Sequence, residues 1–426
     1  MQPVRHPLAE GVNFLGITDD RFKTAQLTVA LLLPLQEQTA SSYAILPFLL
    51  RRNCGEYPDF SALQRRLNQL YGARILADVI RIGSNQALIL TAVSIDDRFA
   101  LNREAITQQC AELLRSMIFE PAFKDGHFND DDTELEKRCL VELIQSEIND
   151  KRLYSRQRCE QILCEGEGYA VNRYGTIDGV GALTPEHVTN AWKRALQSAQ
   201  VCIVYQATSC GAIADNLAKS FAAAAGRAPT PLITAEKRTI KNKREVVERL
   251  DVNQAKLVLG FKAYNSAGDD IAAMRLMNAL LGGTPHSLLF KNVREKLSLC
   301  YYCSSSYDRF GRVLLIDSGV DEQNAKKAQE QIIKQYDAVC RGDFTDGDIE
   351  SARTSLENQF RSIEDHQSSL ATWYIGQSLD NNISTPAQAA DELYSVTRDR
   401  IVNAARSISL EAVYMLAAKE GEHAGK

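Results

Sequence analysis

An internal repeat is the feature that most constrains how this chain can fold. Both halves of the 426-residue sequence present the same order of patterns: one strand, two helices, two further strands and a closing helix. An acidic pair follows the last strand of each half, at Asp96-Asp97 and at Asp321-Glu322. The expected strands and helices are 26–35, 41–52, 60–70, 73–82 and 86–95 in the first half, and 254–261, 269–281, 286–296, 299–306 and 312–320 in the second.

The closing helix of each half is predicted from apolar residues at helical spacing, which place one face against a core. These positions are Leu101, Ala105, Cys110, Leu113 and Met117 in the first half, and Ala328, Ile332, Tyr336 and Val339 in the second. Sheets and helices in this order are typical of a layered α+β architecture. We therefore expect an α+β fold of two similar halves, each an antiparallel-rich β-sheet with helices packed on one face.

A stretch rich in proline and small residues, which then turns basic, marks the boundary between the halves. It contains Pro229 and Pro231 and continues into Lys237, Arg238 and Lys241. Prolines favour an extended connection and the charges keep it in water, so we interpret the stretch as a solvated linker rather than an interaction tail. The predicted organisation is an N-terminal domain over 1–226, a linker over 227–242 and a C-terminal domain over 243–426.

Charge and cysteine usage exclude several function classes. Lys+Arg 49 against Asp+Glu 54 gives a net charge of -5, so the sequence lacks the basic footprint of a nucleic-acid-binding protein. The most apolar stretch, Leu27–Leu35, is too short to span a bilayer, and the start of the chain has no secretion-signal pattern. The ten cysteines are irregularly spaced, which favours reduced thiols over a disulfide framework. These features predict a cytoplasmic protein without a membrane span.

Residues 281–301 form the most specific segment of the sequence and read LGGTPHSLLFKNVREKLSLCY. This segment closely resembles the second-half signature of the pitrilysin/insulinase-type zinc peptidases, the family that includes the mitochondrial processing peptidase subunits. In that signature Leu-Gly-Gly-Gly and small residues precede Leu-Phe and then Arg-Glu-Lys-x-Gly-Leu-x-Tyr. The family is built from two similar α+β halves, so the resemblance covers essentially the whole chain as architecture and residues 281–301 as a motif.

The resemblance implies a metal-binding helix in the first half, but this chain lacks its ligands. In the family, His-x-x-Glu-His supplies two zinc ligands and a general base. Aligned on the apolar pattern, Pro47, Leu50 and Arg51 stand at these positions, and none of them can bind zinc or act as a base. Glu142 or Glu147 lies roughly where the family places its third ligand, and we interpret either as a solvated helix carboxylate. The six histidines are isolated, at His6, His127, His187, His286, His366 and His423.

The second-half segment keeps two side chains that the resemblance assigns to substrate binding, Arg294 and Tyr301. In the family, residues at these positions form a pair that holds the substrate backbone beside the zinc. A guanidinium donates several hydrogen bonds to carbonyl oxygens, and a phenol can donate to an oxyanion. The alternative is a purely structural role, in which the arginine ends a helix and the tyrosine packs in the core. Ser298 replaces the glycine that the family pattern has before Leu-x-Tyr, which puts the geometry of this turn in question.

The other candidate functional residues of this segment have weaker support from the sequence. Cys300 and Cys303 have the spacing of a redox or metal pair, but residues three apart on a regular strand point to opposite faces. His286 follows Pro285 and is interpreted as a capping or packing residue rather than a base. The chain shows no Gly-x-Ser-x-Gly nucleophile motif, and the two glycines at 282–283 lack the context of a phosphate-binding loop.

These observations lead to a function hypothesis with alternatives left open. We expect no catalytic residue, metal or cofactor in this chain, which would act as the non-catalytic, substrate-binding companion of a zinc-bearing peptidase subunit of the same family. The heterodimer would cleave extended peptides held by strand addition to a sheet edge. One alternative is a purely structural or binding member of the family. Another is a stand-alone enzyme that uses Cys300 or Cys303, and a homodimer as the free state stays open.

Overall fold

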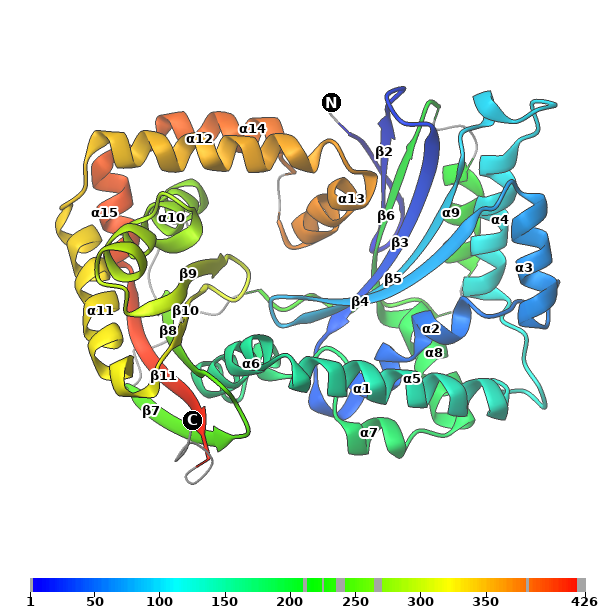
Figure 1. Ribbon diagram of the computed structural model, residues 1–426. Coiled ribbons are helices and arrows are strands. Elements are labelled where there is room, and N and C mark those ends of the chain that lie inside the picture. Colours follow the sequence, from blue (N-terminus) through cyan, green and yellow to red (C-terminus); the bar gives the residue numbers. More distant parts are fainter. Residues whose placement is uncertain are drawn as a thin grey trace. The chain divides into compact units, whose positions relative to one another are not determined.

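The structure is a computed structural model of the chain and describes residues 3–209, 213–223, 226–234, 242–263, 270–380 and 383–419. The basic part of the predicted linker, 235–241, and His423 lie outside these residues. The chain forms two compact units, each assembled from three segments (Figure 1). Unit 1 comprises Met1–Ile144, Val171–Ile233 and His366–Thr385, and unit 2 comprises Gln145–Ala170, Thr234–Asp365 and Pro386–Lys426.

Unit 1 is built on a six-stranded sheet with the strand order β1-β2-β6-β3-β5-β4. β2 and β6 are parallel, and the other neighbouring pairs are antiparallel. The central strand β3 is apolar and buried along almost its whole length, as a strand covered on both faces should be. The strands are β1 (Val4–Ala9), β2 (Val12–Thr18), β3 (Thr24–Pro34), β4 (Arg74–Ile82), β5 (Asn85–Ile95) and β6 (Gln200–Ala207).

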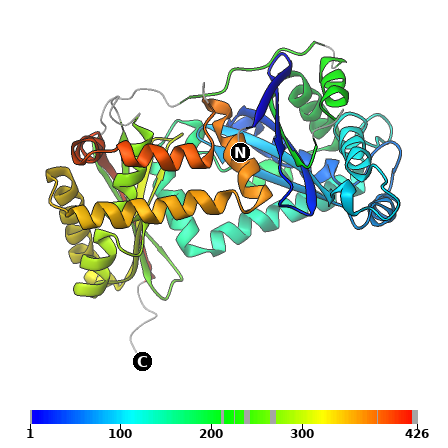
Figure 2. The same cartoon turned by 90° about the horizontal axis from the view of Figure 1, so that it is seen from above.

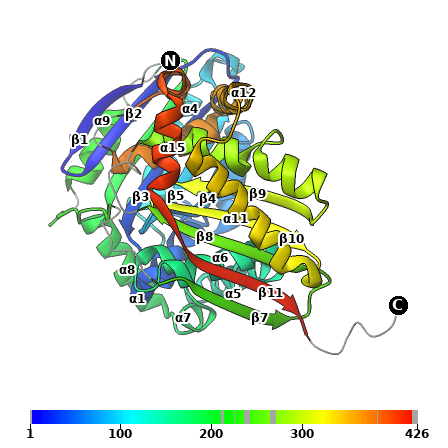
Figure 3. The ribbon, with the colours of Figure 1, turned by 90° about the vertical axis from the view of Figure 1, so that its left-hand side faces the viewer.

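Unit 2 is built on a five-stranded sheet with the strand order β7-β11-β8-β10-β9 (Figure 3). β7 and β11 are parallel, and the other neighbouring pairs are antiparallel. β9 is the last strand of this order and therefore forms one edge of the sheet. The strands are β7 (Arg244–Leu250), β8 (Ala255–Ala263), β9 (Cys300–Asp308), β10 (Val313–Val320) and β11 (Ile408–Ala418).

The two sheets share one topology, which confirms the predicted α+β fold of two similar halves. Without β1, the strands of unit 1 correspond position by position to β7, β11, β8, β10 and β9 of unit 2. In both sheets a parallel pair lies next to three antiparallel strands, and the first strand predicted in each half, β3 or β8, lies in the middle. The sequence repeat therefore reflects a repeat of the strand connections.

The helices of unit 1 follow the predicted order with two differences. The single helix expected over 41–52 is divided at Ile45, because Pro47 lies in the first turn of the second helix and lacks the N–H that a continuous helix would use. Leu101 is 85% exposed because α4 begins only at Ile106. The helices are α1 (Glu37–Ala44), α2 (Leu46–Leu50), α3 (Phe60–Gln69), α4 (Ile106–Phe119), α5 (Asp130–Asn149), α7 (Ile177–Gly181), α8 (Pro185–Ser198), α9 (Ile213–Ala223) and α13 (Gln367–Gly376).

Unit 2 carries its long helices as predicted, with Ala328, Ile332 and Val339 fully buried along α11. α14 lies beside α12 (Figure 2). Two π-helical segments replace α-helix in the region of the family motif, and such segments are frequent at functional sites. The helices are α6 (Lys151–Leu163), α10 (Ile271–Asn278), η4 (Ala279–Gly283), η5 (Leu289–Lys296), α11 (Ala325–Arg341), α12 (Asp346–Ile363), α14 (Pro386–Glu392) and α15 (Arg398–Arg406).

Each sheet carries one helix from the other half of the sequence. α6 contacts β8, β10 and β11, and α13 contacts β3 and β6. The division of the chain into 1–226 and 243–426 assigns α6 to the first half and α13 to the second, whereas the compact units place them the other way round. The sequence does not indicate the exchange, because neither helix has a marked apolar stripe that could be matched to a sheet.

In unit 2, α6 covers one face of the sheet and α11 covers the opposite face, which corrects the expectation that the helices pack on one face only. Val258 of β8 belongs to the apolar core around Cys159 and Leu163 of α6. Phe261, three residues further along β8, stacks on Tyr336 of α11 with ring centroids 4.7 Å apart. Because successive side chains of a strand alternate between faces, Val258 and Phe261 mark two different layers.

Candidate functional site

The positions aligned with the family's zinc ligands are occupied by packing residues in unit 1. Pro47 lies in the first turn of α2 and Leu50 ends that helix, and both are buried. Arg51 follows the helix and places its guanidinium 5.5 Å from the ring centroid of Phe48. Zinc binds imidazole, thiolate or carboxylate groups, and a pyrrolidine, an aliphatic side chain and a guanidinium offer none of these. These three residues therefore do not fit a zinc ion.

A salt-bridge cluster lies directly after this helix. Arg52 Nε is 2.9 Å from Asp132 Oδ1, and its Nη1 is 2.9 Å from Glu136 Oε1. Asn53 Nδ2 donates to the second oxygen of Asp132 at 2.9 Å. Burial acts to lower the pKa of Arg52, but the hydrogen bonds and charges of Glu136 and Asp132 outweigh it and raise that pKa. The guanidinium supplies the positive charge that the two carboxylates of α5 require.

This cluster was not predicted from the sequence, although Asp132 and Glu136 lie one helical turn apart and therefore share a face. The third family ligand was expected at Glu142 or Glu147, with a solvated side chain at either position. Glu142 is exposed, but Glu147 is 6% exposed and accepts a hydrogen bond from Gln157 Nε2 at 3.0 Å. Within the described residues, no three His, Cys, Asp or Glu side chains gather as a metal site would require.

The structure places Arg294 and Tyr301 on either side of the turn that joins η5 to β9. Arg294 is exposed and lies over the ring of Phe290, 4.5 Å from its centroid. Tyr301 is 61% exposed, and its hydroxyl donates to Asp321 Oδ1 at 3.3 Å. No hydrogen bond between Arg294 and Tyr301 is found in the described part of the chain. Both side chains keep their polar groups at the surface of unit 2, which a core tyrosine would not.

The turn itself has the backbone conformation that a glycine would favour. Ser298 has a φ of 49°, in the left-handed region, where a non-glycine residue is strained. Leu299 N donates to Val293 O at 3.2 Å, which closes the end of η5. The replacement of the family's glycine by Ser298 therefore leaves this positive-φ conformation in place.

A β-bulge at Tyr301 corrects the expectation that Cys300 and Cys303 point to opposite faces. Cys303 pairs with Ser318 and Tyr302 with Gly319, but Cys300 pairs with Val320. Tyr301 is therefore the extra residue of the bulged strand, and it shifts the alternation of side chains by one. Both cysteines lie on one face, with exposed fractions of 8% for Cys300 and 4% for Cys303. The sequence carried no signal for this bulge.

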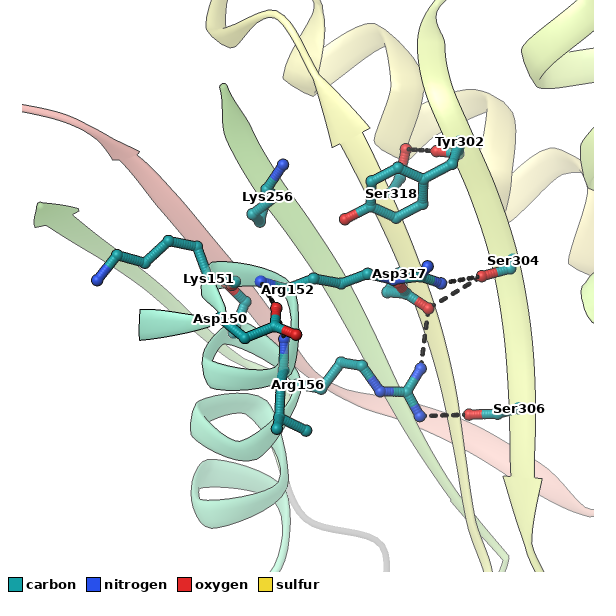
Figure 4. Close-up of polar contacts among 12 residues, drawn as sticks. Asp150, Lys151, Arg152, Arg156, Lys256, Tyr302, Ser304, Ser306, Asp317 and Ser318 are labelled. Carbon is teal, nitrogen blue, oxygen red and sulfur yellow. Dashed lines mark hydrogen bonds and ion pairs between the residues drawn. The ribbon is translucent and has the colours of Figure 1, made fainter. Parts of the chain in front are cut away.

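Two arginines of α6 reach the other face of the same hairpin (Figure 4). Arg152 Nε is 2.5 Å from Asp317 Oδ2, and Arg156 Nη1 is 2.8 Å from Asp317 Oδ1. Asp317 is only 1% exposed, so the two guanidinium groups compensate a buried charge. The same arginines donate to hydroxyls of β9, at 2.8 Å for Ser304 and 2.6 Å for Ser306.

Two cations lie near the ring of Tyr302, next to this cluster (Figure 4). The guanidinium carbon of Arg152 is 4.3 Å and Lys256 Nζ is 5.6 Å from its ring centroid. Burial and the charge of Arg152 lower the pKa of Lys256, and burial raises the pKa of Tyr302. The Tyr302 hydroxyl is buried and has no hydrogen-bond partner among the described residues.

His286 is exposed, which corrects the expectation that it caps or packs a helix. The cap at this position is Ser287, which is 1% exposed and whose Oγ accepts from Phe290 N at 3.4 Å.

Within the described residues, no helix is long and apolar enough to cross a membrane.

Comparison with known proteins supports the family resemblance. The peptidase M16 inactive domain family matches residues 182–356. The chain is 28% identical over 418 residues to the "Probable inactive metalloprotease YmfF" of Bacillus subtilis, covering 95% of each chain. It is also 26% identical over 171 residues to the "Uncharacterized zinc protease YmxG" of the same organism, covering 39% of this chain and 42% of that one. A crystal structure of a conserved protein from Enterococcus faecalis superposes with a TM-score of 0.87 at 24% identity, covering 99% and 100% of the chains.

Proposed function

Because the chain is a non-catalytic member of the pitrilysin-type peptidase M16 family, we propose that it is the substrate-binding companion subunit of a two-subunit zinc peptidase. The observation that carries the proposal is the contrast between its two motif regions. The zinc-ligand positions hold Pro47, Leu50 and Arg51, whereas Arg294 and Tyr301 are retained and exposed. A chain with one half of such a site requires a partner for the other half.

The zinc and the general base would come from a partner of the same family that carries His-x-x-Glu-His. Bacillus subtilis has both a relative named as an inactive metalloprotease and one named as a zinc protease, so the two kinds of chain occur together in one organism. The nine described cysteines are free thiols, which fits the cytoplasmic location that we propose for the complex.

The substrate would be an extended peptide that pairs with the edge strand β9. Tyr301 is the first exposed residue of this strand, and Arg294 lies before the turn that leads into it. A peptide strand at this edge would receive its backbone hydrogen bonds from β9, and the two side chains would donate further hydrogen bonds to its carbonyl oxygens. No reaction step is assigned to this chain.

The test uses the full chain mixed with the zinc-bearing family member of the same organism and a peptide library. We expect Arg294→Ala and Tyr301→Phe each to lower kcat/KM for peptide cleavage by at least about tenfold, the loss of a good charged or transition-state hydrogen bond. Assembly, measured by analytical ultracentrifugation, should be unchanged because both side chains are exposed. Arg341→Ala and Tyr394→Phe are matched controls, since these side chains are also exposed in unit 2.

A purely structural role is the competing account. It predicts an assembled complex whose peptide cleavage is the same with Arg294→Ala, Tyr301→Phe and the controls, or a complex that cleaves no peptide at all. Either result would remove the substrate-binding role while leaving the family membership intact.

A further inference from the structure

The cysteine pair Cys300 and Cys303 has a geometry that the proposed substrate binding does not use. The bulge at Tyr301 places both thiols on the face of the sheet that η5 and η4 contact, away from α6. Their ladder partners on β10, Val320 and Ser318, are two residues apart, so Cys300 and Cys303 are neighbouring side chains on this face. We infer that Cys300 and Cys303 form a redox-active dithiol that closes an intrachain disulfide around Tyr301.

The surroundings of the two thiols divide their roles. The neighbouring Cys303 thiol, with a smaller contribution from the positive charge of Arg294, lowers the pKa of Cys300. The neighbouring Cys300 thiol and burial raise the pKa of Cys303. Cys300 is also the more exposed of the two. Since the thiolate is the nucleophile, Cys300 is the attacking and Cys303 the resolving thiol.

Cys110, Cys164 and Cys202 are also buried but lack this arrangement. Burial raises the pKa of Cys110 and Cys202 to about 11 and that of Cys164 to about 12. Thiols in such apolar surroundings are inert at neutral pH. Cys164 is also hydrogen-bonded by Lys262 Nζ at 3.3 Å, but its pKa is still raised. The chain therefore supplies its own negative controls.

The reaction with a disulfide oxidant such as oxidised glutathione balances in two steps. The Cys300 thiolate attacks one glutathione sulfur, forms a mixed disulfide and releases a glutathione thiolate. Cys303 then loses its proton and attacks the Cys300 sulfur, which forms the intrachain disulfide and releases the second glutathione. In total the two cysteines lose two protons and two electrons, and the oxidised glutathione gains them.

Oxidation would tie together the residues on both sides of Tyr301. The bulge residue would then be held between two linked backbone positions, so its side chain would lose freedom to adjust to a peptide. An effect of the disulfide on peptide binding rests on the proposed function, whereas the formation of the disulfide does not. The two ideas can therefore fail separately.

The experiment equilibrates the full reduced chain in glutathione buffers of graded ratio, blocks free thiols and digests with trypsin. Cleavage after Lys296 and Arg309 leaves both cysteines in one peptide, 297–309. We expect this peptide to lose both blocked thiols together and to become two hydrogens lighter than the reduced peptide. The peptides that carry Cys110 and Cys202 should stay blocked as free thiols across the same buffers.

A second measurement follows the rate of iodoacetamide alkylation at Cys300 against pH. In the native chain the rate should rise through neutral pH. Cys303→Ala removes the neighbouring thiol and should slow alkylation below neutral pH by at least about threefold, whereas Cys303→Ser keeps a hydrogen-bond donor there and should change it less. The proposal is overturned if peptide 297–309 retains two free thiols in every buffer, or if a single glutathione adduct accumulates on Cys300.

Discussion

The two units hold a helix against equivalent sheets by different chemistry. In unit 1, α13 is held by amides and hydroxyls: Gln367 Nε2 donates to Thr24 O at 3.0 Å, and Gln206 Nε2 donates to Gln367 O at 2.8 Å. In unit 2, α6 is held by Arg152 and Arg156 on the buried carboxylate of Asp317. One topology therefore accepts either a neutral or a charged layer at the same place.

The two units also differ in the polar side chains near their motif regions. In unit 1, Arg52 directly follows a helix of packing residues and pairs with Asp132 and Glu136. Unit 2 keeps cations around Tyr302 and exposed polar side chains at Arg294 and Tyr301. The positions aligned with the zinc ligands hold packing residues in unit 1, whereas the positions aligned with the substrate pair hold exposed polar side chains in unit 2.

The largest expected effect comes from breaking the charged layer of unit 2. Asp317→Asn removes the partner charge of two arginines while it preserves the shape of the side chain. We expect the free energy of unfolding to fall by about 3 kcal/mol, as for other broken buried ion pairs, reduced somewhat because Arg152 is half exposed. Urea denaturation of the purified chain measures this loss, with Asp337→Asn as the control at an exposed carboxylate of unit 2. A loss no greater than that of the control would contradict a stabilising role for the ion pairs of Asp317.

The corresponding change in unit 1 should cost less. Gln367→Ala removes the side-chain hydrogen bonds to the hydroxyl and the carbonyl oxygen of Thr24, at 2.6 and 3.0 Å. Two neutral hydrogen bonds correspond to about 2 kcal/mol of unfolding free energy. The same urea experiment compares it with Gln323→Ala, a control at an exposed glutamine of unit 2. If Gln367→Ala lowers the free energy of unfolding more than Asp317→Asn does, the neutral contacts of α13 stabilise the fold more than the charged contacts of α6, contrary to our expectation.

The smallest expected effect is a stabilisation at the turn of unit 2. Ser298→Gly restores the residue type that the left-handed conformation favours. Relief of about 1–2 kcal/mol of backbone strain, offset by about 0.5–1 kcal/mol of added entropy in the unfolded chain, leaves a gain of about 0.5 kcal/mol. The melting temperature should rise slightly, and Ser362→Gly in the last turn of α12 should lower it. A fall with Ser298→Gly would show that the serine hydroxyl matters more than the backbone.

Much of the fold could be predicted because it follows local periodicity. The apolar run that became β3 and the alternations that became β4 and β5 were predicted with nearly the observed bounds. The exchange of α6 and α13 could not be predicted, because neither helix has a marked apolar stripe and a helix pattern does not show which sheet buries it. The domain boundaries 1–226 and 243–426 remain a description of the sequence halves rather than of the compact units.

The candidate site also has features that could be predicted from the sequence and features that could not. Pro47, Leu50 and Arg51 could be excluded as ligands from residue chemistry alone. The Arg52 cluster could not be found, because its carboxylates lie 80 and 84 residues away in the chain and meet the guanidinium only through tertiary packing. The bulge at Tyr301 also escaped prediction, since a single inserted residue leaves the strand pattern almost unchanged and reverses the face of Cys300.

The central claim is that this chain supplies a substrate-binding half to a zinc-bearing partner. The most direct measurement is affinity capture of the full chain from its native cell, followed by mass spectrometry and zinc analysis of the complex. We predict one partner with a His-x-x-Glu-His sequence, about one zinc per pair of chains, and no zinc in this chain once the two are separated. Recovery of this chain without such a partner, or with zinc bound to the chain itself, would contradict the account.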